Sequence, residues 1–238
     1  MMKIQITADG SHTLFSEMAG QTYHSSHGAI QESQYIFISQ LSTFDSQLSI
    51  LEIGFGTGLN AVLAAKWARE NRTQINYTTI ELYPLEKKFY TLLNYGQLLG
   101  CEELFLQLHD VEWDAGIQKI NDAFAIRKCK CDIVEWLRYN AQSLNLLDSS
   151  CLAIESQFSI PDSQYDVVFF DAFSPDAQPE LWTEEVFLNV YRLMKKGGVM
   201  TTYCAKGDVR RAMLAAGFKV EKLQGPPGKR HILRAKKE

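Results

Sequence analysis

Cysteine is scarce in the chain, with five residues among 238 and no regular spacing between them. An odd, irregular set of cysteines argues against a disulfide scaffold. Cys129 and Cys131 would share one face of a strand, where the simplest role is core packing. The five histidines do not cluster with the cysteines, so the sequence lacks the ligand spacing of a zinc site. We therefore predict a protein without a bound metal.

Long apolar stretches are also missing. No run approaches the roughly 20 residues that span a bilayer, and the first residues, Met1–Gln5, lack the apolar core of a signal peptide. We therefore expect a cytoplasmic protein without membrane association. A chain of this length with 46% hydrophobic residues is large enough for one α/β domain with additions.

The chain has no overall positive charge, since its formal net charge is −4. That value alone disfavours a nucleic-acid partner. The basic residues are nevertheless concentrated near the end, because residues 192–238 contain 13 Lys or Arg and only 3 Asp or Glu. Such asymmetry predicts a face that binds a polyanion, although a solvated basic tail is an alternative explanation.

A glycine-rich motif between residues 50 and 60 is the strongest feature of the sequence. An apolar run that contains Glu52 leads into glycines at every second position, and the helix-forming segment 61–67 follows. This order predicts a strand, a tight turn and the start of a helix. The helix N-terminus would offer free N–H groups to a ligand.

The spacing of these glycines decides between ligands. The third glycine of a dinucleotide fingerprint would fall at Leu59, and the Gly-Lys-Ser/Thr of a phosphate-binding loop is absent. Glu-x-Gly-x-Gly-x-Gly is instead the pattern of Rossmann-like S-adenosylmethionine (SAM) methyltransferases, whose ligand has no phosphate and whose amino group suits Glu52. We predict a SAM site, with a glycine-rich turn that binds nothing as the alternative. The cofactor-binding residues expected in this segment are Glu52, Gly54, Phe55, Gly56, Gly58 and Asn60.

Three further acids close predicted strands. Glu81 ends the strand 74–81, where the ribose hydroxyls of adenosine cofactors are usually bound, and a carboxylate accepts both hydroxyl protons. Asp132 follows a strand that ends near residue 131 and is expected at the adenine amino group, or as the N-cap of the next helix. Asp171 ends the apolar strand 166–171. With Glu52, these acids would lie along one edge of a doubly wound sheet, where such folds bind ligands.

The other segments complete a Rossmann-like α/β architecture. We predict a mostly parallel sheet that ends in an antiparallel hairpin of residues 218–221 and 231–235. We also predict a helix over 85–99, a hairpin with a strand at 105–108, and a helix that reaches about residue 195 and ends at Gly197 and Gly198.

Residues 1–46 are expected to form an N-terminal extension packed on a methyltransferase domain of residues 47–238. Alternating residues on both sides of Asp9–Gly10 predict a hairpin, and a helix-like segment follows it. The extension would either cap the ligand pocket or serve as a plain structural hairpin.

Several motifs together resemble one family. The segment Leu51–Asn60, the block Phe170–Pro175 and the downstream Pro179–Thr183 are similar to the methyltransferase domains of the MnmC family, which form 5-methylaminomethyl-2-thiouridine at the wobble position of tRNA. Tyr23–Glu32 resembles the N-terminal segment of this family, and Gly207–Arg230 resembles its C-terminal segment. The family often has Lys-Asn-Pro in place of the Ala-Gln-Pro at 177–179, so any substrate contact by that lysine has no counterpart in this chain.

The resemblance implies a reaction and a partner. The enzyme would methylate the nitrogen of a 5-aminomethyl group on the wobble (2-thio)uridine of tRNA, with SAM as the methyl donor. Many relatives also carry a C-terminal FAD oxidase domain. The chain ends at Glu238, so a stand-alone form that only methylates is expected.

For this reaction we also predict which residues act. Asp171 would accept a proton from the acceptor amine, and Phe173 and Pro175 would shape a slot for a flipped-out base. Tyr23 and His27 would close the pocket. The residues expected to bind tRNA phosphates are Arg210, Arg211, Lys229 and Arg230.

Other classes of function stay open at this point. A small-molecule amine or hydroxyl methyltransferase shares the fold, as does a spermidine synthase, whose product has a different mass. A non-catalytic SAM- and RNA-binding module would bind both ligands without turnover. The basic end of the chain favours tRNA, and Asp171 favours catalysis. The sequence does not predict the oligomeric state.

Overall fold

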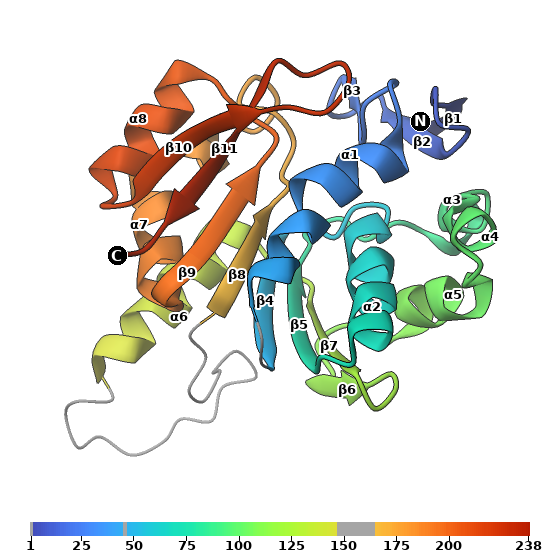
Figure 1. Cartoon of the computed structure of the whole chain (residues 1–238), viewed down its shortest axis with the longest axis horizontal. Coiled ribbons are helices and arrows are strands. Elements are labelled where there is room, and N and C mark those ends of the chain that lie inside the picture. The colour runs from blue at the N-terminus through green and yellow to red at the C-terminus, as the bar shows by residue number, and fades with distance from the viewer. Residues whose placement is uncertain (1, 45–46, 147–164) are drawn as a thin grey trace.

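The computed structural model describes residues 2–44, 47–146 and 165–238. Its centre is an eight-stranded sheet with the strand order β10-β11-β9-β8-β4-β5-β7-β6 (Figure 1). The inner pairs are parallel, whereas β6, β10 and β11 run antiparallel to their neighbours. The strands of this sheet are β4 (Leu48–Ile53), β5 (Ile75–Ile80), β6 (Ile117–Lys119), β7 (Phe124–Cys129), β8 (Tyr165–Phe170), β9 (Met194–Thr202), β10 (Lys219–Gln224) and β11 (His231–Lys236). The predicted doubly wound sheet with an antiparallel C-terminal strand is confirmed.

Helices cover both faces of the sheet (Figure 1). Phe169 belongs to the core under α1, α2 and α5, while Phe170 belongs to the core under α6, α7 and α8. Successive residues of a strand point to opposite faces, so the segment 167–170 of β8 is apolar throughout because both of its faces are buried. The helices are α1 (Ala29–Ile36), α2 (Leu59–Asn71), α3 (Lys87–Tyr90), α4 (Tyr95–Leu99), α5 (Glu102–Asp110), α6 (Ile133–Leu146), α7 (Glu184–Leu193) and α8 (Gly207–Ala215), with 3₁₀ helices η1 (Ile38–Thr43) and η2 (Pro179–Trp182).

The N-terminal extension begins with a small antiparallel sheet of β1 (Met2–Ile6), β2 (His12–Ser16) and β3 (Gln21–Thr22). This confirms the predicted hairpin around Gly10. Helix α1 and η1 then pack against α2, and Ile36 and Leu41 are buried in the same core as Leu63. The extension therefore shares the core of the large sheet, and the division after residue 46 stays a prediction.

The expected strand at 105–108 is wrong. Residues 102–110 form α5, in which Phe105, Leu108 and His109 are buried. A spacing of three and four residues is that of one helix face. The alternation of leucine with polar and aromatic residues obscures this period in the sequence. The hairpin of β7 is instead made with β6.

Two helix boundaries also differ from the prediction. The helix expected over 85–99 is split into α3 and α4, with Asn94 between them accepting the backbone N–H of His12 at 2.8 Å and donating to the carbonyl of Gly10 at 3.0 Å. At the end of α7, Gly197 and Gly198 lie within β9 rather than after a helix. Their backbone groups pair with Lys237, which extends the ladder with β11.

None of the helices in the described ranges is long and apolar enough to cross a bilayer. The same ranges contain no group of three or more His, Cys, Asp or Glu side chains able to hold a metal ion.

Candidate active site

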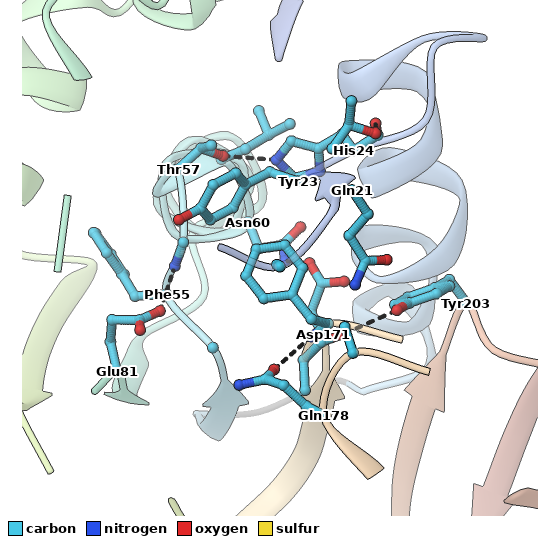
Figure 2. Close-up of a pocket in the computed structure, with 18 of the residues that line it drawn as sticks. Gln21, Tyr23, His24, Phe55, Thr57, Asn60, Glu81, Asp171, Gln178 and Tyr203 are labelled. Carbon is cyan, nitrogen blue, oxygen red and sulfur yellow. Dashed lines mark hydrogen bonds between the residues drawn. The ribbon is translucent and has the colours of Figure 1, made fainter. Parts of the chain in front are cut away.

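A cavity of about 540 Å³ opens at the carboxyl edge of β4, β5 and β8. Figure 2 shows side chains that converge on it from the N-terminal extension, the glycine loop and the loops after β5 and β8. A volume in this range suits a cofactor-sized ligand. Its lining includes Gln21, Tyr23, His24, Glu32, Gly54, Phe55, Gly56, Thr57, Asn60, Glu81, Tyr83, Ile133, Asp171, Phe173, Gln178, Tyr203 and Lys229.

The glycines at 54, 56 and 58 allow this loop to pass close to other parts of the protein. All three have positive φ, between +50° and +91°. A Cβ at Gly54 would lie 3.0 Å from the carbonyl oxygen of Asp171, and one at Gly58 would lie 2.7 Å from Nε2 of His109. At Gly56 the neighbour is the Tyr23 ring, also at 3.0 Å. A side chain at any of these three positions would therefore clash with its neighbours.

Glu81 is held rigidly at the cofactor end of the cavity. One of its carboxylate oxygens accepts the N–H of Gly56 at 3.1 Å, and the other accepts the N–H of Tyr83 at 2.9 Å. Burial raises the pKa of Glu81, which the two backbone donors partly offset. The fixed carboxylate lines the cavity beside the apolar Ile133 and the Tyr83 ring, an arrangement that fits a ribose and an adenine better than a phosphate.

Asp171 is the titratable group at the other end of the cavity. It follows β8, and Oδ2 accepts a hydrogen bond of 2.7 Å from the side-chain amide of Asn60. Burial raises the pKa of Asp171 to about 8. A carboxyl group with this proton affinity can exchange a proton with an amine near neutral pH.

The loop that carries Asp171 is fixed by three hydrogen bonds. The Tyr203 hydroxyl donates to the carbonyl of Ala172 at 2.9 Å, and the N–H of Phe173 donates to the Gln178 side chain at 3.0 Å. Nε1 of Trp182 donates to the carbonyl of Phe173 at 2.8 Å. The Phe173 ring consequently faces the Tyr23 ring at a centroid distance of 4.9 Å, and the two form an aromatic wall.

Residues 117–238 match a family model described as S-adenosyl-L-methionine-dependent methyltransferase. The chain belongs to this family. SAM is therefore its methyl donor. The glycine loop, Glu81 and the absence of basic side chains from this end of the described lining fit that ligand.

Curated relatives carry a more specific name. The tRNA 5-methylaminomethyl-2-thiouridine biosynthesis bifunctional protein MnmC of Nitrosospira multiformis is 29% identical over 236 residues, which cover 92% of this chain and 34% of the relative. The protein of the same name from Aeromonas hydrophila is 28% identical over 239 residues, with 93% and 33% covered. The methyltransferase thus spans about a third of the length of these relatives.

A solved structure has the same fold. The crystal structure of MnmC2 from Aquifex aeolicus matches with a TM-score of 0.77 and 24% identity, over 100% of this chain and 70% of that one.

Two acids of the methyltransferase that we expected at the cofactor do not line the cavity. Glu52 is 0% exposed, and one of its oxygens accepts the hydroxyl of Thr79 at 2.7 Å. Burial raises the pKa of Glu52 well above its usual value, so the neutral form is favoured. Asp132 accepts the N–H of Glu135 at 3.0 Å and is the N-cap of α6. Direct contact of Glu52 with the SAM amino group lacks support from this geometry.

His27, which we expected to close the pocket, is not part of the described cavity lining. His27 is exposed and lies against Gly228, where a Cβ would be 2.0 Å from its ring. His24 lines the cavity instead, and Nε2 lies 2.6 Å from the hydroxyl oxygen of Thr57. Burial lowers the pKa of His24 to about 4, so the ring is neutral. His24 thereby joins the N-terminal extension to the glycine loop.

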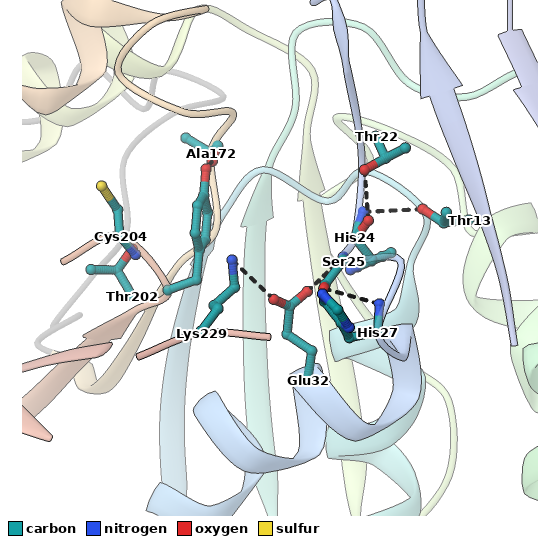
Figure 3. A network of polar contacts seen from close by, with 11 residues as sticks. Thr13, Thr22, His24, Ser25, His27, Glu32, Ala172, Thr202, Cys204 and Lys229 are labelled. Atoms are coloured by element: carbon teal, nitrogen blue, oxygen red, sulfur yellow. Dashed lines mark hydrogen bonds and ion pairs between the residues drawn. The ribbon is translucent and has the colours of Figure 1, made fainter. Parts of the chain in front are cut away.

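Pro175 and Lys229 also differ from expectation. Pro175 is not part of the described lining, and its loop reaches the cavity through Phe173, Ala177 and Gln178. Lys229 is in the cavity, with Nζ 3.2 Å from a carboxylate oxygen of Glu32 (Figure 3).

The other predicted phosphate-binding residues are on the surface. Arg210, Arg211 and Arg230 are all exposed, and Arg211 forms an ion pair with Asp208. Glu32, Tyr203 and Gln178 were missed as site residues. Only Glu32 had a sequence feature that pointed to it, its place in the motif shared with the MnmC family.

Proposed function

We propose that this methyltransferase acts on tRNA and methylates the nitrogen of a 5-aminomethyl group on the wobble uridine, giving 5-methylaminomethyl(-2-thio)uridine. The observation that carries the proposal is Asp171, a half-buried carboxyl with a pKa near 8 that faces the cavity next to an aromatic wall. The names of the curated relatives support the choice of substrate.

At the cofactor end, Glu81 would accept hydrogen bonds from the ribose hydroxyls and the glycine loop would back the methionine part of SAM. When bound, SAM supplies a methyl group from a sulfonium, so that a nitrogen–carbon bond forms as the carbon–sulfur bond breaks with its electron pair left on sulfur. The cavity would hold the acceptor nitrogen and the methyl donor in line, and this positioning would contribute to the rate.

At the acceptor end, Asp171 has the central role. An aminomethyl group is mostly protonated in water and cannot attack until it has lost a proton. The Asp171 carboxylate would take that proton, with Asn60 holding the carboxyl at its other oxygen. Tyr23 and Phe173 would grip the flipped-out base by stacking.

The exposed basic residues Arg210, Arg211 and Arg230 would contact the phosphates of the tRNA, which positions the anticodon over the cavity. A protein with this partner is expected in the cytoplasm.

Nucleoside mass spectrometry tests the proposal. Purified protein and SAM are incubated with tRNA that bears 5-aminomethyl-2-thiouridine, and the digested nucleosides are compared with those of a reaction containing Asp171→Asn. We expect that nucleoside alone to gain one methyl group in the wild-type reaction. If it stays unchanged while calorimetry shows that SAM binds, the substrate is a small molecule or the protein is a binding module.

A further inference from the structure

Lys229 lies inside the cavity, whereas a residue that binds tRNA phosphates would be expected on the surface. Its side chain is 26% exposed and reaches into the cavity, where Nζ lies 3.2 Å from Oε1 of Glu32 and 4.7 Å from the centroid of the Tyr203 ring. It comes from the loop between β10 and β11, whereas Glu32 is on α1 (Figure 3). Lys229 is thus the point where the two ends of the chain meet inside the site.

Both contacts of Lys229 are themselves fixed. The second oxygen of Glu32 accepts the N–H of Ser25 at 2.9 Å, whereas Oε1 has the ion pair with Lys229 and no hydrogen bond within the described residues. The Tyr203 hydroxyl donates to the carbonyl of Ala172, the residue after Asp171. An ammonium held between a buried carboxylate and an aromatic face has a defined position.

Asp171 is surrounded by groups from several elements. Asn60 of α2 donates to its carboxyl, while Glu32 of α1 and Lys229 contribute opposite charges. Tyr203, which follows β9, and Glu52 of β4, which burial favours in its neutral form, also interact electrostatically with Asp171. Without Lys229, the negative charge of Glu32 would disfavour ionisation of Asp171, because two neighbouring carboxylates resist joint ionisation.

We propose that Lys229 and Glu32 form a fixed charge pair beside Asp171, in which Lys229 cancels the charge of Glu32 and so keeps the Asp171 carboxyl available in its ionised, proton-accepting form. Lys229 is then a positioning residue for methyl transfer rather than a phosphate ligand. This inference rests on the proposed function for its purpose, although the effect on Asp171 exists without substrate.

The direct test is a carbon-13 NMR titration of protein labelled at aspartate. The carboxyl signal of Asp171 is assigned by its loss in Asp171→Asn. In Lys229→Met, the midpoint of the Asp171 titration is expected to move up by about one pH unit, because Glu32 is left unbalanced. Lys229→Arg should keep the midpoint, and the double variant Glu32→Gln/Lys229→Met should return it close to that of the wild type. A midpoint that stays in place in Lys229→Met overturns the proposal.

Kinetics separate this role from a merely structural one. The kcat of Lys229→Met should fall about tenfold at pH 7 and recover at pH 9, with the KM for tRNA unchanged. A phosphate ligand would instead raise that KM at every pH and weaken its salt dependence. Lys229→Gln repeats the charge change with a polar tip in case the Met variant folds poorly. Since the titration needs no turnover, a moving midpoint in an enzyme inactive on tRNA refutes only the proposed function, and a fixed midpoint in an active enzyme refutes only this inference.

Discussion

The two ends of the cavity are assembled in different ways. The cofactor end comes mainly from one stretch of chain, in which the N–H of Gly56 in the glycine loop after β4 donates a hydrogen bond to the side-chain carboxylate of Glu81 after β5. The acceptor end combines Glu32, Asp171, Tyr203 and Lys229, which span most of the chain. The part of the cavity that binds SAM can thus be built from a local motif. The part that binds the methyl acceptor depends on how the two ends of the chain pack across the sheet.

The largest expected effect breaks the acceptor end and spares the cofactor end. Asp171→Asn keeps the size of the side chain and removes the proton acceptor. We expect methyl transfer to fall by roughly 10²–10⁴-fold, with the affinity for SAM changed only a few fold. Single-turnover kinetics and calorimetry measure the two quantities, and near-normal turnover would remove Asp171 from the chemistry.

The converse change breaks the cofactor end. In Gly58→Ala the new Cβ would be 2.7 Å from Nε2 of His109 at a φ of +72°, so the loop must shift. We expect SAM to bind about tenfold more weakly and the free energy of unfolding to fall by more than about 2 kcal/mol. Gly116→Ala is the control, because its φ of +79° is similar and its Cβ would meet open space. Equal effects at both positions would show that only backbone strain matters.

The pH dependence of folding stability tests the acceptor end without any substrate. The folded protein binds the Asp171 proton more tightly than the unfolded chain, since the pKa rises from 3.8 to about 8. Ionisation of Asp171 therefore lowers stability as the pH rises from about 4 to about 8. We expect Asp171→Asn to be more stable than the wild type at pH 8, by more than about 1 kcal/mol, and to lose this advantage near pH 4. Thermal melts across this range would refute the raised pKa if the difference were constant.

The smallest effect concerns the surface outside the cavity. The double variant Arg210→Ala/Arg211→Ala should weaken tRNA binding by about tenfold. The slope of log affinity against log salt concentration should become shallower by an amount equivalent to up to about two phosphate contacts. SAM affinity should not change. Lys87→Ala/Lys88→Ala on α3 removes the same charge elsewhere and should leave tRNA affinity alone. Equal losses in both variants would point to net charge rather than to a docking site.

The predictable parts of the molecule are those whose cause is local. Buried parallel strands such as β4 and β8 consist mainly of apolar residues, and the glycine spacing is a property of a few neighbouring residues. Helix α5 escapes prediction because its apolar residues alternate over a short stretch while burial follows a helical period.

The acceptor end escapes prediction for a different reason. Nothing local indicates that Glu32 and Lys229 pair across the whole length of the chain, or that the Tyr203 ring lies under that lysine. A count of charges likewise places Lys229 with the surface arginines, since sequence alone cannot say which side of a hairpin loop faces a cavity. His24 and His27 show the same limit, because only the tertiary contact with Thr57 selects one of them.

The pH dependence of single-turnover methyl transfer to tRNA, with SAM saturating, tests the central claim most directly. The account predicts a rate constant for the wild type that rises with pH, reaches half of its maximum near pH 8 and levels off above that pH, and a rate constant for Asp171→Asn that is low at every pH. A wild-type rate that does not change between pH 6 and 9, or an Asp171→Asn rate close to that of the wild type, would contradict it.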